Sequence, residues 1–150
     1  MKTKVILMFL LLALPFGMVS AQSNAGKWIK ISDDGIVTIS YNSNITTTKS
    51  GEHIVWVKAE YHTAEWQNYL AQQAGLRTPV ASTRTKAQFD ARYNFVMVRQ
   101  VFCYNKAGKQ IFNSGDDTSA GWGPVNAGDP VGIVGEHLGD KIRYNETYGY

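Results

Sequence analysis

Apolar and polar residues alternate along much of the chain, and this spacing predicts short β-strands. The segments 27–32 ("KWIKIS") and 36–41 ("IVTISY") flank an Asp-Gly pair. Glycine accepts the positive φ that a tight turn requires, so these two segments predict a β-hairpin.

The same alternation continues in segment 53–61 ("HIVWVKAEY"), which follows a polar turn. Val55, Val57, Ala59 and Tyr61 fall on one face of this segment, and Trp56, Lys58 and Glu60 fall on the other. Period two with one polar face is typical of a half-buried antiparallel strand.

Segment 64–74 changes to a helical period. Thr63 precedes it as an N-cap candidate, and Gly75 follows as a left-handed stop. The three- and four-residue spacing of the larger side chains predicts one main helix that packs on the sheet. We expect three residues of this helix to face the sheet: Trp66, Tyr69 and Leu70. The polar segment 76–86, which contains proline, predicts an exposed connection.

Segment 86–104 is the longest β-like stretch and is interpreted as a single strand. One face of such a strand would carry Phe89, Ala91, Tyr93, Phe95, Met97, Val101 and Cys103, with Arg99 as the exception. A turn at 105–109 and a returning strand at 110–114 complete a second hairpin.

The C-terminal part begins as a Gly/Pro loop, and a short helix is predicted from Pro130 to Leu138, followed by a frayed end at 143–150. The expected fold is therefore α+β and mostly β. It is a single antiparallel sheet of about five or six strands, a common sheet size, with one main helix packed on it.

The first residues predict export. Two lysines, an apolar run of 5–16 and small residues ending at Ala21 form the three parts of a cleavable signal peptide. We expect a signal peptide at 1–21, cleavage near Ala21 and a single domain at 22–150. The apolar run is too short to span a bilayer comfortably, so no transmembrane segment is expected in the mature chain. This predicts an exported protein, periplasmic or secreted.

Cleavage also changes the charge. The full chain has 15 basic and 12 acidic residues, and loss of Lys2 and Lys4 leaves 13 basic residues and a net charge of +1. A nearly neutral protein has no long-range field to attract nucleic acid, so no nucleic-acid partner is expected.

Candidate chemistry is sparse. Cys103 is the one cysteine, it lacks a local nucleophile signature, and its apolar neighbours predict a buried, inert thiol. The histidines His53, His62 and His137 show no zinc-helix spacing, and no phosphate-binding loop or nucleophile elbow occurs. We therefore predict no catalytic residue, no metal site and no cofactor.

Binding residues are easier to nominate. Tryptophan on an outer sheet face or in a loop can anchor a partner, although it is more often a partly buried packing residue. Trp56, which shares a face with Lys58, is the best candidate for exposure, and Trp122 lies in the Gly/Pro loop. The predicted binding residues are Trp56, Lys58 and Trp122.

The order of these segments resembles the surface-adhesin protein E-like family of small exported bacterial proteins. The resemblance covers nearly all of the mature chain and rests on "WIKISDDGIVTISY", "VWVK", "FDARYNF", "YNKAGKQI" and "WGPVNAGDPV". In the family pattern one cysteine follows the aspartate of the long strand and another closes the chain. Here Ala91 follows Asp90 and no cysteine occurs after Trp122, so both halves of that disulfide are missing.

The resemblance implies a non-catalytic binding protein, since some members bind extracellular matrix proteins such as vitronectin and laminin. Host matrix or cell-envelope proteins are the expected partners. One alternative is a small periplasmic hydrolase or metal-dependent enzyme built on His53, His62, His137 and the aspartates. A further alternative is a structural envelope protein without a ligand.

Overall fold

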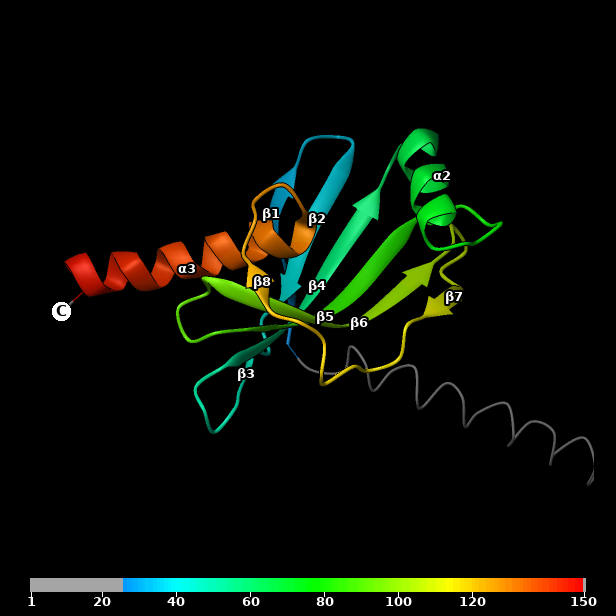
Figure 1. The fold of residues 1–150 in the computed structure, drawn as a ribbon. Helices are drawn as coiled ribbons and strands as arrows, with labels where there is room; N and C mark the ends of the chain where they lie inside the picture. Colours follow the sequence, from blue (N-terminus) through cyan, green and yellow to red (C-terminus); the bar gives the residue numbers. More distant parts are fainter. Residues whose placement is uncertain (1–25, 150) are drawn as a thin grey trace, which may run out of the picture.

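The computed structural model describes residues 26–149, and Figure 1 shows one twisted sheet with a helix at each of two places on it. The elements in chain order are β1 (Trp28–Asp33), β2 (Val37–Asn42), β3 (Thr46–Thr47), β4 (His53–Tyr61), α2 (Ala64–Gln73), β5 (Ser82–Phe89), β6 (Phe95–Tyr104), β7 (Gln110–Asn113), β8 (Gly123–Pro124) and α3 (Pro130–Tyr148). The signal peptide predicted at 1–21 lies outside the described residues.

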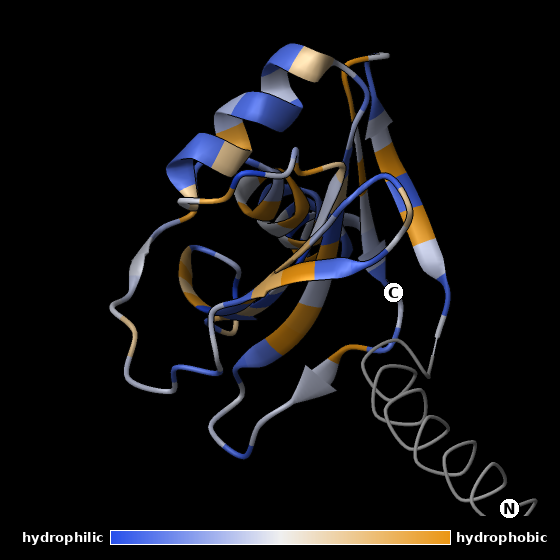
Figure 2. Cartoon of the chain, turned by 90° about the vertical axis from the view of Figure 1, so that its right-hand side faces the viewer, coloured by the Kyte–Doolittle hydropathy of each residue, from blue (hydrophilic) through white to orange (hydrophobic). Residues whose placement is uncertain are grey.

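The sheet is antiparallel throughout, with the strand order β1-β2-β4-β5-β6-β7. The two-residue strands β3 and β8 pair with β4 and β6. The six longer strands therefore lie side by side in the order in which they follow one another in the sequence, and α2 lies in the connection between β4 and β5. The predicted α+β fold with a single antiparallel sheet is confirmed. Figure 2 shows the alternation of apolar and polar residues along β1.

One face of the sheet carries the core, and α3 covers it. Val131, Val134 and Leu138 of α3 pack against a cluster from the strands that includes Ile39, Tyr41, Val55, Val57 and Phe89. We call this side of the sheet the helix face. Asp129 begins α3 as its N-cap, accepting a hydrogen bond from the Gly132 backbone N–H at 2.7 Å, and Pro130 occupies the first turn.

The second helix, α2, packs at another part of the same face. Ala71 of α2 contacts a small cluster with Val80 and Cys103. The predicted ends of α2 are confirmed, because Thr63 Oγ1 accepts a hydrogen bond from the Trp66 N–H at 3.3 Å and Gly75 has φ of +69°.

The predicted orientation of α2 is wrong for its two aromatic residues. Trp66 and Tyr69 are 43% and 49% exposed, whereas Leu70 is half-buried and Gln67 is buried. The Gln67 side-chain amide donates to the Tyr61 backbone carbonyl at 2.7 Å, and the Gln67 backbone carbonyl accepts from the Val80 N–H at 3.0 Å. The side-chain bond holds a polar residue on the buried side of α2, and most of α2 is hydrophilic (Figure 2).

The connection predicted at 76–86 is confirmed for its exposed first part, 77–79, and is wrong for the remainder. It turns into β5 at Ser82, and Val80 is fully buried beside α2. β5 is hydrogen-bonded to β4 on one side and to β6 on the other. The composition of this segment favours a loop, but hydrogen bonding to a neighbouring strand on both edges makes it a central strand of the sheet.

The single strand predicted at 86–104 is instead two strands joined by a turn. Asp90 Oδ1 accepts hydrogen bonds from the Asn94 and Phe95 N–H groups at 2.7 and 2.8 Å, which closes the turn. Tyr93 adopts φ of 61° within it and is buried, while Ala91 is exposed.

A β-bulge within β6 corrects the predicted face further. Lys86 pairs with Gln100 and Ala87 pairs with Val98, so Arg99 is the extra residue. One additional residue reverses which face the following side chains occupy. Met97 and Phe95 therefore lie on the opposite face from Cys103, although Met97 is buried and Phe95 is 51% exposed.

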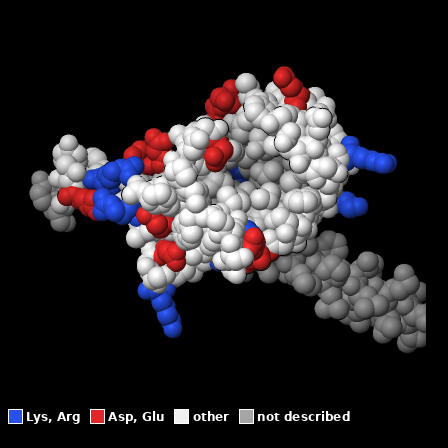
Figure 3. Space-filling view, viewed as in Figure 1, with Lys and Arg blue, Asp and Glu red and all other residues white. Residues whose placement is uncertain are grey.

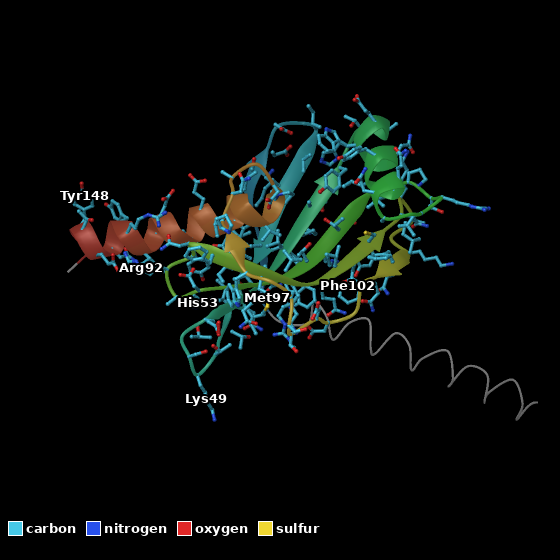
Figure 4. All side chains as sticks on the ribbon, in the orientation of Figure 1. Lys49, His53, Arg92, Met97, Phe102 and Tyr148 are labelled. Carbon is cyan, nitrogen blue, oxygen red and sulfur yellow. The ribbon has the colours of Figure 1, made fainter. Side chains whose placement is uncertain are left out.

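The C-terminal helix is longer than predicted. α3 continues ten residues beyond Leu138, to Tyr148, where a frayed end was expected. Arg92 of the β5–β6 turn donates two hydrogen bonds to the Glu146 carboxylate, at 2.7 and 2.8 Å, and Figure 4 shows Arg92 beside this part of α3. Tyr144 and Tyr148 also pack together, with ring centroids 5.1 Å apart. No helix between residues 26 and 149 is long and apolar enough to cross a membrane.

Candidate binding surface

The face of the sheet opposite the helices carries a group of aromatic and basic side chains. The register places Lys58 of β4 opposite Ser40 on one side and Arg84 on the other, and Arg84 opposite Phe102 of β6. Directly paired residues point to the same side of a sheet. We call this side the outer face.

Arg84 is the centre of this group. Its guanidinium carbon lies 5.4 Å from the ring centroid of Trp28 and 5.3 Å from that of Tyr104. Lys58 Nζ lies 4.7 Å from the same Trp28 ring. Trp28, Lys58, Arg84 and Tyr104 therefore form one cation–π group, which we call the Arg84 cluster. Such contacts hold a flexible basic side chain in one orientation, each contributing about 0.5–1 kcal/mol at exposed sites.

Trp56 lies next to this cluster but is less exposed than predicted. It is half-buried, and its ring packs against the buried ring of Phe102 with centroids 5.9 Å apart. Trp56 therefore supplies part of an apolar surface rather than a free anchor. The prediction that Trp56 shares a face with Lys58 is confirmed by the alternation of β4.

The basic residues of the outer face differ in their partners. Lys58 Nζ lies 3.4 Å from a Glu60 carboxylate oxygen. Lys86 and Arg99 both bind the Asp116 carboxylate, each at 2.9 Å, and the hydrogen bond from Lys86 is the main reason that the pKa of Asp116 is lowered, with Arg99 adding to it. Arg84 is half-buried and makes no ion pair with any residue of 26–149. Within residues 26–149, no carboxylate is paired with its charge.

Trp122, the third predicted binding residue, lies elsewhere. It is 45% exposed and precedes β8, which pairs with Phe95 and Val96 at the other end of β6. Within the described chain, no ring or cation contact joins Trp122 to the Arg84 cluster. The structure therefore brings Trp56 and Lys58 together and leaves Trp122 apart.

The three histidines have separate surroundings. His53 stacks on Tyr93 at 4.8 Å between centroids and is within hydrogen-bonding distance of Thr47 Oγ1 and the Ala91 carbonyl. Figure 4 shows His53 near the base of the β3–β4 hairpin, whose tip carries Lys49. His62 contacts Thr38 Oγ1 at 2.7 Å.

The third histidine, His137 of α3, packs near Tyr41. Burial, followed by the charge of Lys141, lowers the pKa of His137. Across residues 26–149, no three His, Cys, Asp or Glu side chains are grouped so that they could hold a metal ion.

Three members of the Arg84 cluster were missed by sequence analysis: Trp28, Arg84 and Tyr104. Arg84 fell in the segment interpreted as a connection, although Thr83, Thr85 and Ala87 alternate there with polar residues. That alternation was the available signal for a strand. Nothing in the sequence indicated that β1 and β6 would both present an aromatic ring to the same guanidinium.

The chain was compared with known proteins, and no family model, no curated protein and no solved structure matches it. The resemblance to the adhesin E-like family therefore stays a prediction from the sequence segments.

Proposed function

We propose that this is an exported, non-catalytic protein of the surface-adhesin E-like type that binds a partner protein through the outer face of its sheet. The observation that carries the proposal is Arg84, a half-buried guanidinium held between two aromatic rings without a carboxylate partner in the described chain. The three histidines have separate partners, so they do not form one joint site among the described residues.

The chemistry of the Arg84 cluster favours a particular kind of contact. A guanidinium presents donors in a planar fork that matches a carboxylate, and stacking on rings leaves the edge of that fork available. Trp28 and Trp56, both half-buried, provide amphipathic area that loses little entropy on binding, whereas Tyr104 is buried and contributes by holding the guanidinium. The cluster therefore suits a protein surface with a carboxylate beside an apolar group, such as a matrix or cell-envelope protein.

The proposal is tested by capture of partners on the immobilised purified protein. Envelope extracts and the matrix proteins vitronectin and laminin are passed over it, and bound proteins are identified by mass spectrometry. We then measure the affinity of each captured protein for Arg84→Ala and for Arg77→Ala. Arg77 is an exposed arginine in the loop that follows α2, so its variant is a matched control.

We expect Arg84→Ala to weaken binding at least about tenfold, because central arginines are frequent binding hot spots, and Arg77→Ala to leave it unchanged. A partner that binds both variants as it binds the wild type would contradict the outer face as the site. Failure to capture any protein specifically would contradict the binding function itself.

A further inference from the structure

On the helix face, an open groove lies between α2 and the start of α3. It has a volume of about 370 Å³, and Val37, Ile39 and Tyr61 of the sheet form its floor. Trp66 and Leu70 form the wall on α2, while Ile133 forms the wall on α3. Figure 3 shows the surface hollowed between these two helices. We call this feature the α2–α3 groove.

Exposed apolar side chains extend the α2–α3 groove onto the surface. Trp66 is 43% exposed and meets Tyr69 edge-on, with centroids 5.6 Å apart. Exposed tryptophan and tyrosine beside a concave apolar surface are the residues that most often dominate a protein interface.

Carboxylates surround the α2–α3 groove. Asp34 and Asp129 line it, and Glu65 lies next to Trp66 at the start of α2. None of these three acids forms an ion pair within residues 26–149, whereas the neighbouring Asp33 is 3.6 Å from Lys30 Nζ. Among the described residues that line the groove, none is lysine or arginine. Figure 3 shows acidic residues around the hollow, at the β1–β2 turn, at the start of α2 and before α3.

Two of these carboxylates also have structural roles that keep them in place. Asp34 Oδ1 accepts hydrogen bonds from the Val37 and Ile36 N–H groups, both at 2.8 Å. These two bonds lower the pKa of Asp34, and the bond from Val37 has the larger effect. Asp129 accepts from Gly132 as the N-cap of α3. Each acid therefore holds its negative charge at a fixed point of the rim.

We propose that the α2–α3 groove binds a basic, apolar segment of a partner protein, one in which aliphatic side chains alternate with lysine or arginine. The aliphatic side chains bury against Val37, Ile39 and Leu70, and the basic groups reach the carboxylates of Asp34, Glu65 and Asp129. An acidic segment is rejected, because its charges meet three carboxylates without counter-ions. This site is on the opposite side of the sheet from the Arg84 cluster, so its occupancy is independent of the proposed function.

The test uses two synthetic probes. One is a nine-residue peptide of alternating lysine and leucine, and the other has glutamate in place of each lysine. Binding of each peptide to the purified protein is measured by isothermal titration calorimetry. We expect the lysine peptide to bind with Kd below about 1 mM, more weakly as salt is raised, and the glutamate peptide not to bind.

Variants locate the site. Trp66→Ala should weaken binding of the lysine peptide about tenfold. Trp122→Ala is the matched control, since Trp122 has nearly the same exposure and lies outside the groove, and it should bind within twofold of wild type. Glu65→Lys, at an exposed position of the first turn of α2, should weaken binding severalfold and tests the charge separately.

Thermal unfolding shows whether each variant is folded. If Trp66→Ala is unfolded, Glu65→Lys alone tests whether the peptide binds at the α2–α3 groove. No binding of the lysine peptide by the wild type overturns the proposal. Equal binding of the glutamate peptide also overturns it, as does an effect of Trp122→Ala as large as that of Trp66→Ala.

Discussion

At the scale of single residues, Cys103 shows how surroundings decide the chemistry of a side chain. It lies on the helix face among Ala71, Val80 and Phe112, and burial raises the pKa of its thiol. Since the thiolate is the reactive form, a raised pKa suppresses disulfide exchange and oxidation near neutral pH. The predicted burial of Cys103 is confirmed, and its inertness remains to be measured.

Cys103 should therefore react slowly in the folded protein. We expect labelling with a thiol reagent to be slow in native buffer and fast in denaturant. Cys103→Ser should lower the free energy of unfolding by roughly 1–3 kcal/mol if the hydroxyl finds no partner, and Cys103→Ala should cost less because it leaves only a small cavity. Fast labelling in native buffer would contradict burial and reopen a role as a nucleophile or in an intermolecular disulfide.

At the scale of elements, the glycines of α3 decide how closely this helix approaches the rest of the fold. A Cβ atom on Gly132 would lie 1.5 Å from the Asn126 carbonyl oxygen, and one on Gly135 would lie 2.6 Å from the Phe89 ring. Gly139 is looser, because the nearest atoms to its Cβ would be the Arg143 guanidinium at 3.2 Å and the Arg92 carbonyl oxygen at 3.3 Å. Close contact is thus concentrated in the first half of α3.

Alanine substitutions should separate these two parts of α3. Gly132→Ala should lower the free energy of unfolding by at least about 3 kcal/mol, because a backbone oxygen cannot move aside as a flexible side chain can. Gly139→Ala should stay within about 1 kcal/mol of wild type, since the better helix propensity of alanine offsets a mild contact. Urea unfolding measures both values. Similar values for the two variants would contradict the close packing of Gly132.

At the scale of the whole molecule, the pH dependence of stability should report how α3 sits on the sheet. Burial, with help from the charge of Lys141, lowers the pKa of His137 below its usual 6.5, while Asp140 opposes this shift. The unfolded chain therefore binds a proton at a higher pH than the folded protein does. The stability that neutral His137 contributes is present above pH 6.5 and is lost as the pH falls through the lower, folded pKa.

The midpoint of thermal unfolding should consequently fall as the pH is lowered from 7.5 to 5.5, and it should fall less in His137→Gln. Most carboxylates titrate below this window, so the difference between the two proteins isolates the imidazole. An equal decrease in both proteins would show that His137 is not desolvated as the structure places it.

A second prediction at this scale concerns export. The charged start, apolar run and small residues at 1–21 predict that the exported protein begins at Gln22. The intact mass of the protein recovered outside the cytoplasm measures this directly. Recovery of a chain that still begins at Met1 in a membrane fraction would show that the segment is an anchor.

The candidate surface was predictable in part. The two-residue repeat of side-chain direction in a strand places Trp56 and Lys58 on one face of β4, and this holds regardless of which strands pair with β4. It does not state which residues of other strands stand beside them. Trp28 and Tyr104 meet Arg84 only because the register and curvature of the sheet bring β1, β5 and β6 together. An aromatic–guanidinium contact across several strands leaves no pattern in the sequence.

Local interactions were within the reach of the sequence by itself. The β1–β2 hairpin, the Thr63 cap and the left-handed Gly75 depend on residues a few positions apart, so their patterns determine them. The buried face of α2, the bulge at Arg99 and the length of α3 were decided only by the tertiary structure. Each of them depends on hydrogen bonds or contacts with residues distant in the sequence. These interactions override the local preference of a segment for helix, strand or loop, and they are stronger where the partner is buried.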